Sequence, residues 1–141
     1  MKAFSKMAGV GIGVTAAVLL AGGPANAAAY KYEVSCKIPG AQGYVHYGTD
    51  SSTKISVRVG VYDSSADGHH PQARLLTKNN SGEIVYYSWH SDLDGANNGW
   101  LAWDTYATDS NGISDVGVQV GNYEGDQPLD SCSDWDASVF N

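Results

Sequence analysis

Basic residues are scarce in this sequence. Lys and Arg number 8 in 141 residues, against 15 Asp and Glu, which gives a formal net charge of −7. A surface of that sign repels phosphate backbones, so nucleic acid is not an expected partner. Anionic membrane surfaces are disfavoured for the same reason. The charge is typical of an acidic domain that stays in solution.

The sequence also lacks an apolar run long enough to span a membrane. Its apolar stretch, residues 10–21, is short and interrupted by glycine, and it follows Lys2 and Lys6. Ala25-Asn26-Ala27 then fits the small-x-small cleavage pattern. These features predict a secretory signal peptide over residues 1–27, hence a secreted, extracellular protein without membrane insertion. Cleavage would leave 6 basic and 15 acidic residues, a net charge of −9.

Cysteine is nearly absent, which excludes a disulfide-rich scaffold. The two cysteines, Cys36 and Cys132, lie near the two ends of the mature chain. A zinc site would need more ligands at closer spacing, and a catalytic thiol would sit oddly beside an available partner. In an exported protein the pair predicts a single disulfide, which would stabilise the fold by ~4 kcal/mol in the chain-entropy model.

No run of apolar residues at helical spacing is present, and the mature chain consists of predicted strands. The clearest covers residues 54–62, where valine and isoleucine occupy every second position. Residues 30–36 alternate in the same way, with Tyr30, Tyr32, Val34 and Cys36 on one face. Further strands are predicted over residues 42–48, 72–78, 83–90, 100–107 and 113–121.

Asparagine and glycine fill the segments between these strands, where they supply the positive φ of tight turns. Residues 75–89, with one such turn in the middle, form the strongest predicted hairpin. The sequence therefore predicts one domain over residues 28–141. We expect a single antiparallel β-sandwich of about seven to eight short strands, stapled by Cys36–Cys132.

The segment VYDSSADGHHPQARL, residues 61–75, raises the question of a metal site. Asp63, Ser65, Asp67 and the following glycine match the start of an EF-hand loop, but Arg74 stands where its bidentate glutamate belongs. The adjacent histidines of this segment point apart in an extended chain and cannot both chelate easily. The segment therefore predicts an aspartate-capped turn, with calcium on Asp63 and Asp67 as the weaker alternative and no other metal or cofactor.

The sequence shows no catalytic constellation. No GxSxG motif is present, and no helix is available to carry a nucleophile elbow. Carboxylate pairs for glycoside cleavage would have to come from Asp92, Asp94, Asp104, Asp109 and Asp115. Nothing in the sequence brings two of them to the required spacing, and aspartates are common in β-turns. We therefore expect that the protein is not an enzyme. If it were one, its turnover would depend on Asp63 or His69.

Aromatic residues point to binding instead. Trp89 and Trp103 are in register with apolar neighbours and are expected to face the core. Trp100 and Tyr106 share the opposite face of their strand with Asp104. That surface suits stacking on a sugar ring or anchoring of a protein partner, unless its rings serve packing alone.

Three stretches carry a resemblance to known proteins: DSSADGHHPQARL (63–75), YYSWH (86–90) and WDTYATDSNGISDVGVQVG (103–121). Over about residues 54–132 the chain resembles small secreted actinomycete proteins with one β-sandwich. In size, export signal, β-rich character and strand-prone N-terminus it also resembles the small adaptor subunit of actinomycete umbrella toxin particles.

The second resemblance implies a non-catalytic link. The adaptor joins a lectin-bearing, trypsin-like subunit to a long ring-and-stalk polypeptide in antibacterial particles released by Streptomyces-like bacteria. Its N-terminal segment is the part expected to engage the trypsin-like subunit. The matching stretch here is residues 28–37, with partner contacts expected from Ala28, Ala29, Tyr30, Lys31, Tyr32 and Glu33.

The expected function is therefore that of a secreted protein-binding module, an adaptor between subunits of an extracellular antibacterial complex. A lectin-like carbohydrate-binding module is the alternative, and a secreted protease inhibitor is a further one. The N-terminal segment itself has two interpretations. It either adds as a strand to a partner's sheet or forms an edge strand of the protein's own sheet, which the inward face of Tyr30 and Tyr32 favours.

Overall fold

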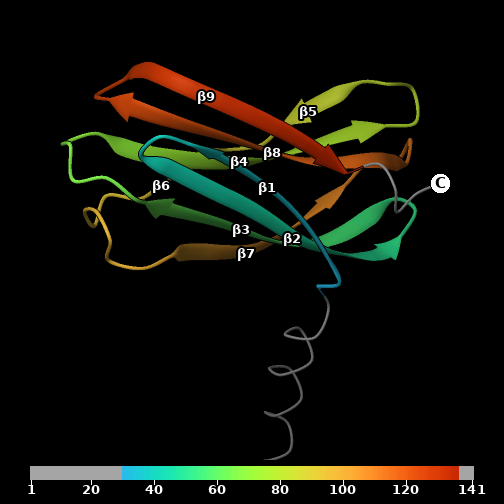
Figure 1. Cartoon of the computed structure of the whole chain (residues 1–141). Coiled ribbons are helices and arrows are strands. Elements are labelled where there is room, and N and C mark those ends of the chain that lie inside the picture. The colour runs from blue at the N-terminus through green and yellow to red at the C-terminus, as the bar shows by residue number, and fades with distance from the viewer. Residues whose placement is uncertain (1–29, 137–141) are drawn as a thin grey trace, which may run out of the picture.

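The chain forms two antiparallel β-sheets packed face to face (Figure 1). The computed structural model describes residues 30–136. Sheet A has the strand order β1-β2-β3-β7, from β1 (Tyr32–Ile38), β2 (Ala41–Ser51), β3 (Lys54–Asp63) and β7 (Leu101–Thr108). Sheet B has the order β5-β4-β8-β9, from β5 (Ile84–Tyr86), β4 (His70–Asn79), β8 (Ile113–Glu124) and β9 (Gln127–Asp136), with β6 (His90–Ser91) also paired to β4.

The predicted β-sandwich is confirmed, with nine strands in place of seven to eight. The predicted signal peptide lies outside the described residues. Within residues 30–136, no helix is long and apolar enough to cross a membrane.

Alternation along β3 shows why these residues form a sandwich. Its four inward side chains are completely buried, whereas the outward positions carry polar residues or glycine. Period-two patterning places one face of each central strand in the core between the sheets. That core is built from Val34, Ile38, Ala41, Val45, Tyr47, Ile55, Val57, Val59, Val61, Ala73, Leu75, Ala107, Ile113, Val116, Val118 and Val120.

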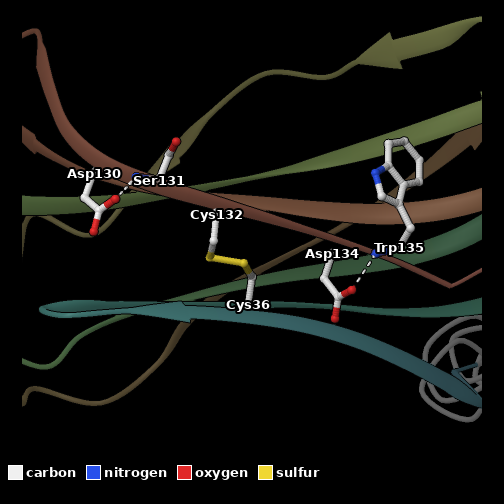
Figure 2. The surroundings of a disulfide bond; sticks show 6 residues. All are labelled: Cys36, Asp130, Ser131, Cys132, Asp134 and Trp135. Atoms are coloured by element: carbon white, nitrogen blue, oxygen red, sulfur yellow. Dashed lines mark hydrogen bonds between the residues drawn. A yellow bond between two sulfur atoms is a disulfide. The ribbon is translucent and has the colours of Figure 1, made fainter.

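The disulfide joins the edges of the two sheets. Cys36 of β1 and Cys132 of β9 are bonded across a sequence separation of 96 residues, as the sequence predicted. Figure 2 shows Cys132 directed toward Cys36, while Trp135 of the same strand points to the opposite side. Tyr47, at the centre of β2, is fully buried and donates its hydroxyl to Asp136 near the end of β9 at 2.9 Å.

Two local predictions were wrong. Residues 83–90 do not form one strand, because the chain leaves β4 between β5 and β6. Trp89 consequently does not join the core; it is half-buried on the outer face of sheet B, and Tyr87 packs against the core instead. Because aromatic residues occupy both faces of residues 83–90, the sequence pattern did not determine which face is buried. Trp103 packs against the core as predicted.

Strand β9 was not predicted, although the disulfide required its segment to approach β1. Its sequence, QPLDSCSDWD, has no apolar alternation because most of the strand is exposed. Its place is fixed by ladder pairing to β8 and by Cys132.

Candidate functional site

The outward residues of β7 define one exposed face of the molecule. Trp100, just before β7, is 46% exposed and Tyr106 is 62% exposed. Asp104 lies between them in register and accepts two hydrogen bonds from Arg58, from Nε at 2.7 Å and from a terminal nitrogen at 2.8 Å. The Tyr30 hydroxyl donates to the same carboxylate at 2.9 Å. The predicted surface residues thus share one side of sheet A, but Asp104 is already engaged.

The ion pair of Arg58 and Asp104 anchors the start of the described chain through Tyr30, and it leaves Asp104 without the freedom of a reactive acid. The hydrogen bonds from Arg58 lower the pKa of the exposed Asp104 carboxyl, so the carboxylate stays charged beside its guanidinium. Arg58 also lies over the ring of Tyr30, 5.7 Å from its centroid. The three side chains hold the entry to β1 against the outer face of sheet A.

Trp100 belongs to a group of aromatic side chains from β2, β3 and the residue before β7. Its ring centroid lies 5.0 Å from that of Tyr44 and 5.3 Å from that of Tyr62, against which it stacks. The Tyr62 hydroxyl donates to Asn97 at 2.9 Å. We call Tyr44, Tyr62 and Trp100 the sheet A aromatic cluster. Sequence reasoning found Trp100 alone, because the pairing of β2, β3 and β7 is needed to unite the three.

A glycine makes the position of Tyr44 possible. Gly60 is paired with Tyr44 on one side and with Ala102 on the other. A Cβ at Gly60 would lie 2.3 Å from the Tyr44 ring, so only glycine lets the ring lie on the sheet. His46 stacks on the other side of Tyr44 with centroids 4.2 Å apart, and its Nε2 is 2.6 Å from Glu33.

Beside the cluster the surface is hollowed, with a volume of about 480 Å³. Its lining combines aromatic side chains with polar and charged ones. The lining side chains include Glu33, Ser35, Lys37, Gln42, Tyr44, His46 and Trp100. A hollow of this kind can stack on a ring or an apolar group and hydrogen-bond to polar groups beside it.

The N-terminal segment pairs with its own sheet as far as it is described. Lys31 donates its backbone N–H to Tyr47 at 3.0 Å, and Tyr32 is the ladder partner of Tyr47. Their rings lie 5.4 Å apart. Of the predicted partner-binding residues, Ala28 and Ala29 lie outside the described residues. Tyr32 and Glu33 begin β1, an edge strand of sheet A, while Tyr30 and Lys31 precede it. Tyr30 does not continue the inward face of this strand as predicted, because its hydroxyl donates to Asp104 on the outer face of sheet A.

The segment that resembled a metal loop is a pair of aspartate-capped turns. The Asp63 carboxylate accepts the backbone N–H of Ser65 at 3.0 Å, and the Asp67 carboxylate accepts that of His69 at 2.9 Å. The His69 hydrogen bond lowers the pKa of Asp67. Within residues 30–136, no group of three or more His, Cys, Asp or Glu side chains is arranged to hold a metal ion. The two hydrogen bonds confirm the predicted turns, and calcium on Asp63 and Asp67 stays a prediction.

A second hollow, of about 530 Å³, lies between this loop and the loop after β6. Its walls contain two buried carboxylates, Asp63 and Asp92. Asp92 accepts the backbone N–H of Asp63 at 3.1 Å and of Asp94 at 3.0 Å, so it ties the two loops together. These carboxylates serve loop geometry, and Asp109 serves the turn before β8 in the same way by accepting the N–H of Asn111.

Comparisons with known proteins add little to this description. No protein-family profile matches the chain, and no curated protein matches it. Among solved structures, it is similar to an endonuclease/exonuclease/phosphatase from Beutenbergia cavernae DSM 12333, with 14% sequence identity and a TM-score of 0.45. The match covers 74% of this chain but only 26% of that protein. Similarity of this degree carries no argument about function.

Proposed function

We propose that this protein is a secreted, non-catalytic binding module that uses the outer face of sheet A to bind another protein. The sheet A aromatic cluster is the observation that carries the proposal. It presents Trp100 at 46% exposure, with Tyr106 at 62% exposure on the same face. Exposed Trp and Tyr side chains at the centre of a surface are typical of the residues that dominate protein interfaces.

The order of the surface supports this proposal. Tyr44 is fixed between His46 and Trp100, and Tyr62 is fixed by its stacking and by Asn97. Side chains held in this way lose little conformational entropy when a partner covers them. The face is therefore preorganised for binding without a movement of the strands.

The acidic residues on this face favour binding over catalysis. Asp104 is held by Arg58 and Tyr30, and Glu33 is held by His46. A general acid or base must exchange a proton with a substrate, which these engaged carboxylates are poorly placed to do. The same side chains can instead set the polar rim of an interface around the aromatic cluster.

The adaptor role implied by the umbrella-particle resemblance is part of the proposal. The partners are then secreted protein subunits of an extracellular toxin complex, and residues 28–33 contribute contacts. Tyr30, the first residue that the structure describes, is tied to Asp104 and Val57 of sheet A. A partner on that face and a partner on the N-terminal segment would be neighbours.

The proposal is tested by native capture of the tagged protein from the culture supernatant of its producer, followed by mass spectrometry. We expect secreted proteins in fixed ratio with the wild type and a large loss of them with Trp100→Ala. Leu129→Ala is the matched control, because Leu129 is 49% exposed but lies on β9. Elution of the wild type alone, or equal capture by both variants, would overturn the proposal.

Deletion of residues 28 and 29 separates the two contributions. This deletion leaves Tyr30 and the whole of β1 in place, so the fold should be unaffected. Loss of a partner on this deletion assigns that partner to the N-terminal segment. Retention of every partner would leave the sheet A face as the binding surface and remove the contacts proposed for residues 28 and 29.

Carbohydrate binding is the second candidate, and the 480 Å³ hollow is the observation that favours it. Trp100 offers a ring beside Gln42, His46 and Glu33, a combination that suits sugar stacking and hydroxyl hydrogen bonds. Glycan-array binding that is lost with Trp100→Ala, in a protein that captures no partner protein, would favour this function. A blank array would exclude it.

A further inference from the structure

The chain contains two arginines, and they are used differently. Arg58, on the outer face of sheet A, is neutralised by Asp104. Arg74, on the outer face of sheet B, forms no ion pair with any carboxylate of residues 30–136. An unpaired guanidinium on a chain of net charge −7 is unexpected, because acidic side chains outnumber basic ones.

Arg74 is nevertheless held firmly in place. It points outward from the middle of β4, opposite Gln119 of β8, and its Nε donates to the Gln119 side-chain oxygen at 2.8 Å. The guanidinium carbon lies 4.6 Å from the ring centroid of Tyr86 and 4.3 Å from that of Trp89. Two cation–π contacts and one hydrogen bond thus fix the orientation of the group.

The aromatic residues are themselves supported by the sheet. Trp89 meets Tyr123 edge to face with centroids 5.8 Å apart. Tyr123 lies over Gly121, where a Cβ would come within 2.7 Å of its ring. The other cation of this face, Lys78, is paired with Asp115 at 3.1 Å. Arg74 is therefore the cation of this face that no carboxylate of residues 30–136 neutralises.

The Nε of Arg74 is used by Gln119, which leaves its terminal Nη groups for a ligand. They form no hydrogen bond with the described part of the chain. We propose that the outer face of sheet B binds an acidic segment of a partner protein, with an Asp or Glu carboxylate on the Nη groups of Arg74. A planar guanidinium with a free edge matches a carboxylate in a bidentate, charge-assisted pair.

The geometry favours a protein carboxylate over a sugar acid. The ring faces of Tyr86 and Trp89 toward Arg74 are occupied by its guanidinium, so they are not available to stack on a sugar ring. Tyr86 is still 55% exposed and can pack against an apolar side chain of the partner. Charge at the centre and an aromatic rim suit a short peptide segment with an acidic residue among apolar ones.

The test is a nuclear magnetic resonance titration that observes the two arginine Nε–H signals. The probes are acetylated triglutamate amide, the matched triglutamine peptide and trigalacturonate. We expect triglutamate to shift the Arg74 signal saturably, while the Arg58 signal, already engaged by Asp104, stays unmoved. Arg74→Lys keeps the charge but loses the fork, and it should weaken triglutamate binding about tenfold.

The proposal fails if triglutamate produces no saturable shift at Arg74, or if triglutamine shifts the signal equally. Stronger binding of trigalacturonate would also overturn it, because the site would then belong to an acidic polysaccharide. Retained signal dispersion in the Arg74→Lys spectrum shows that the variant is folded. The Arg74 signal that decides the test does not involve the sheet A face, where Arg58 serves only as the internal reference, so failure here and failure of the proposed function are distinguishable.

Discussion

Glycines on the outward faces of the sheets leave the space in which aromatic rings lie against the backbone. A Cβ would meet the Tyr44 ring at Gly60, the Trp135 ring at Gly117 and the Tyr123 ring at Gly121. Glycine inside a strand destabilises the strand, because glycine loses more backbone entropy on folding than other residues and contributes no side-chain packing. Here the missing side chain is replaced by a neighbouring ring, which covers the backbone and fixes the surface.

Gly60→Ala tests this relation on the proposed binding face. The new methyl group has to displace the Tyr44 ring, so we expect loss of partner binding and a destabilisation of about 1–3 kcal/mol by overpacking. Gly117→Ala is the matched control, since it displaces Trp135 on the other sheet, a ring that neither proposed binding surface uses. Urea unfolding and partner capture measure the two effects. Equal capture by Gly60→Ala and wild type would contradict the role of the cluster.

His90 gives a residue-scale prediction about pH. Its ring stacks on Trp103 with centroids 4.6 Å apart, and burial lowers its pKa below the usual 6.5. At His90 the unfolded chain therefore binds a proton more readily than the folded chain. The contribution of neutral His90 to the free energy of unfolding is fully present above about pH 6.5, and it is lost as the pH falls through the lowered pKa of the folded state.

We expect wild type to lose more unfolding free energy than His90→Gln between about pH 7.5 and about pH 5.5. Urea midpoints of both proteins at each pH give the double difference. Asp104 and Asp67 do not contribute to this difference between the two proteins, because the lowered pKa of each carboxyl places its titration at more acidic pH. An equal loss in the two proteins would show that His90 does not contribute.

At the scale of elements, the two edge strands joined by the disulfide depend on each other. β9 is largely exposed and has few apolar side chains to hold it, whereas β1 buries Val34 and Ile38. The bond between Cys36 and Cys132 ties the weaker strand to the stronger one and closes one side of the sandwich.

Replacement of both cysteines, Cys36→Ala with Cys132→Ala, should therefore lower the unfolding free energy by about 4 kcal/mol, since the bond closes a loop across 96 residues. We also expect early amide hydrogen exchange in β9, while the β3 amides stay protected until global unfolding. Uniform exchange in both strands would show that β9 is held by its pairing to β8 alone.

At the scale of the whole molecule, the sandwich separates the two proposed binding faces. The sheet A aromatic cluster and Arg74 point outward from opposite sheets, whose backbones are about 10 Å apart. Between them lies a core of completely buried valines from β3 and β8. A rigid core of this kind keeps the two faces independent.

The double variant Trp100→Ala with Arg74→Lys should thus show additive stability changes, within about 0.5 kcal/mol of the sum of the single variants. The amide spectrum of each single variant should change on its own sheet. Chemical shift changes that cross from one sheet's outer face to the other would reveal coupling through the core and contradict the prediction.

The sequence predicted the elements that repeat every second residue, and it failed where that pattern stops. β3 and β8 were found because their valines alternate, and the Asp63 and Asp67 turns followed from aspartate chemistry. β9 was missed because an exposed edge strand needs no alternation.

The position of Trp89 was wrong for a related reason. Residues 84–89 carry aromatic side chains in both registers, so the pattern could not decide which ring is buried. Its contact with Arg74 depends on where the chain leaves β4, which is a tertiary feature.

The sequence by itself determined the strand-rich architecture, the single disulfide and the turns, because each depends on local alternation, on a unique cysteine pair or on a side chain beside its own backbone. Only the tertiary structure decided which outward residues meet. Tyr44, Tyr62 and Trp100 become neighbours because β3 lies between β2 and β7. Arg74 contacts two rings because the pairing of β5 and β6 with β4 brings Tyr86 and Trp89 to it. The order of strands in a sheet is set by non-local packing, which period-two patterning does not encode.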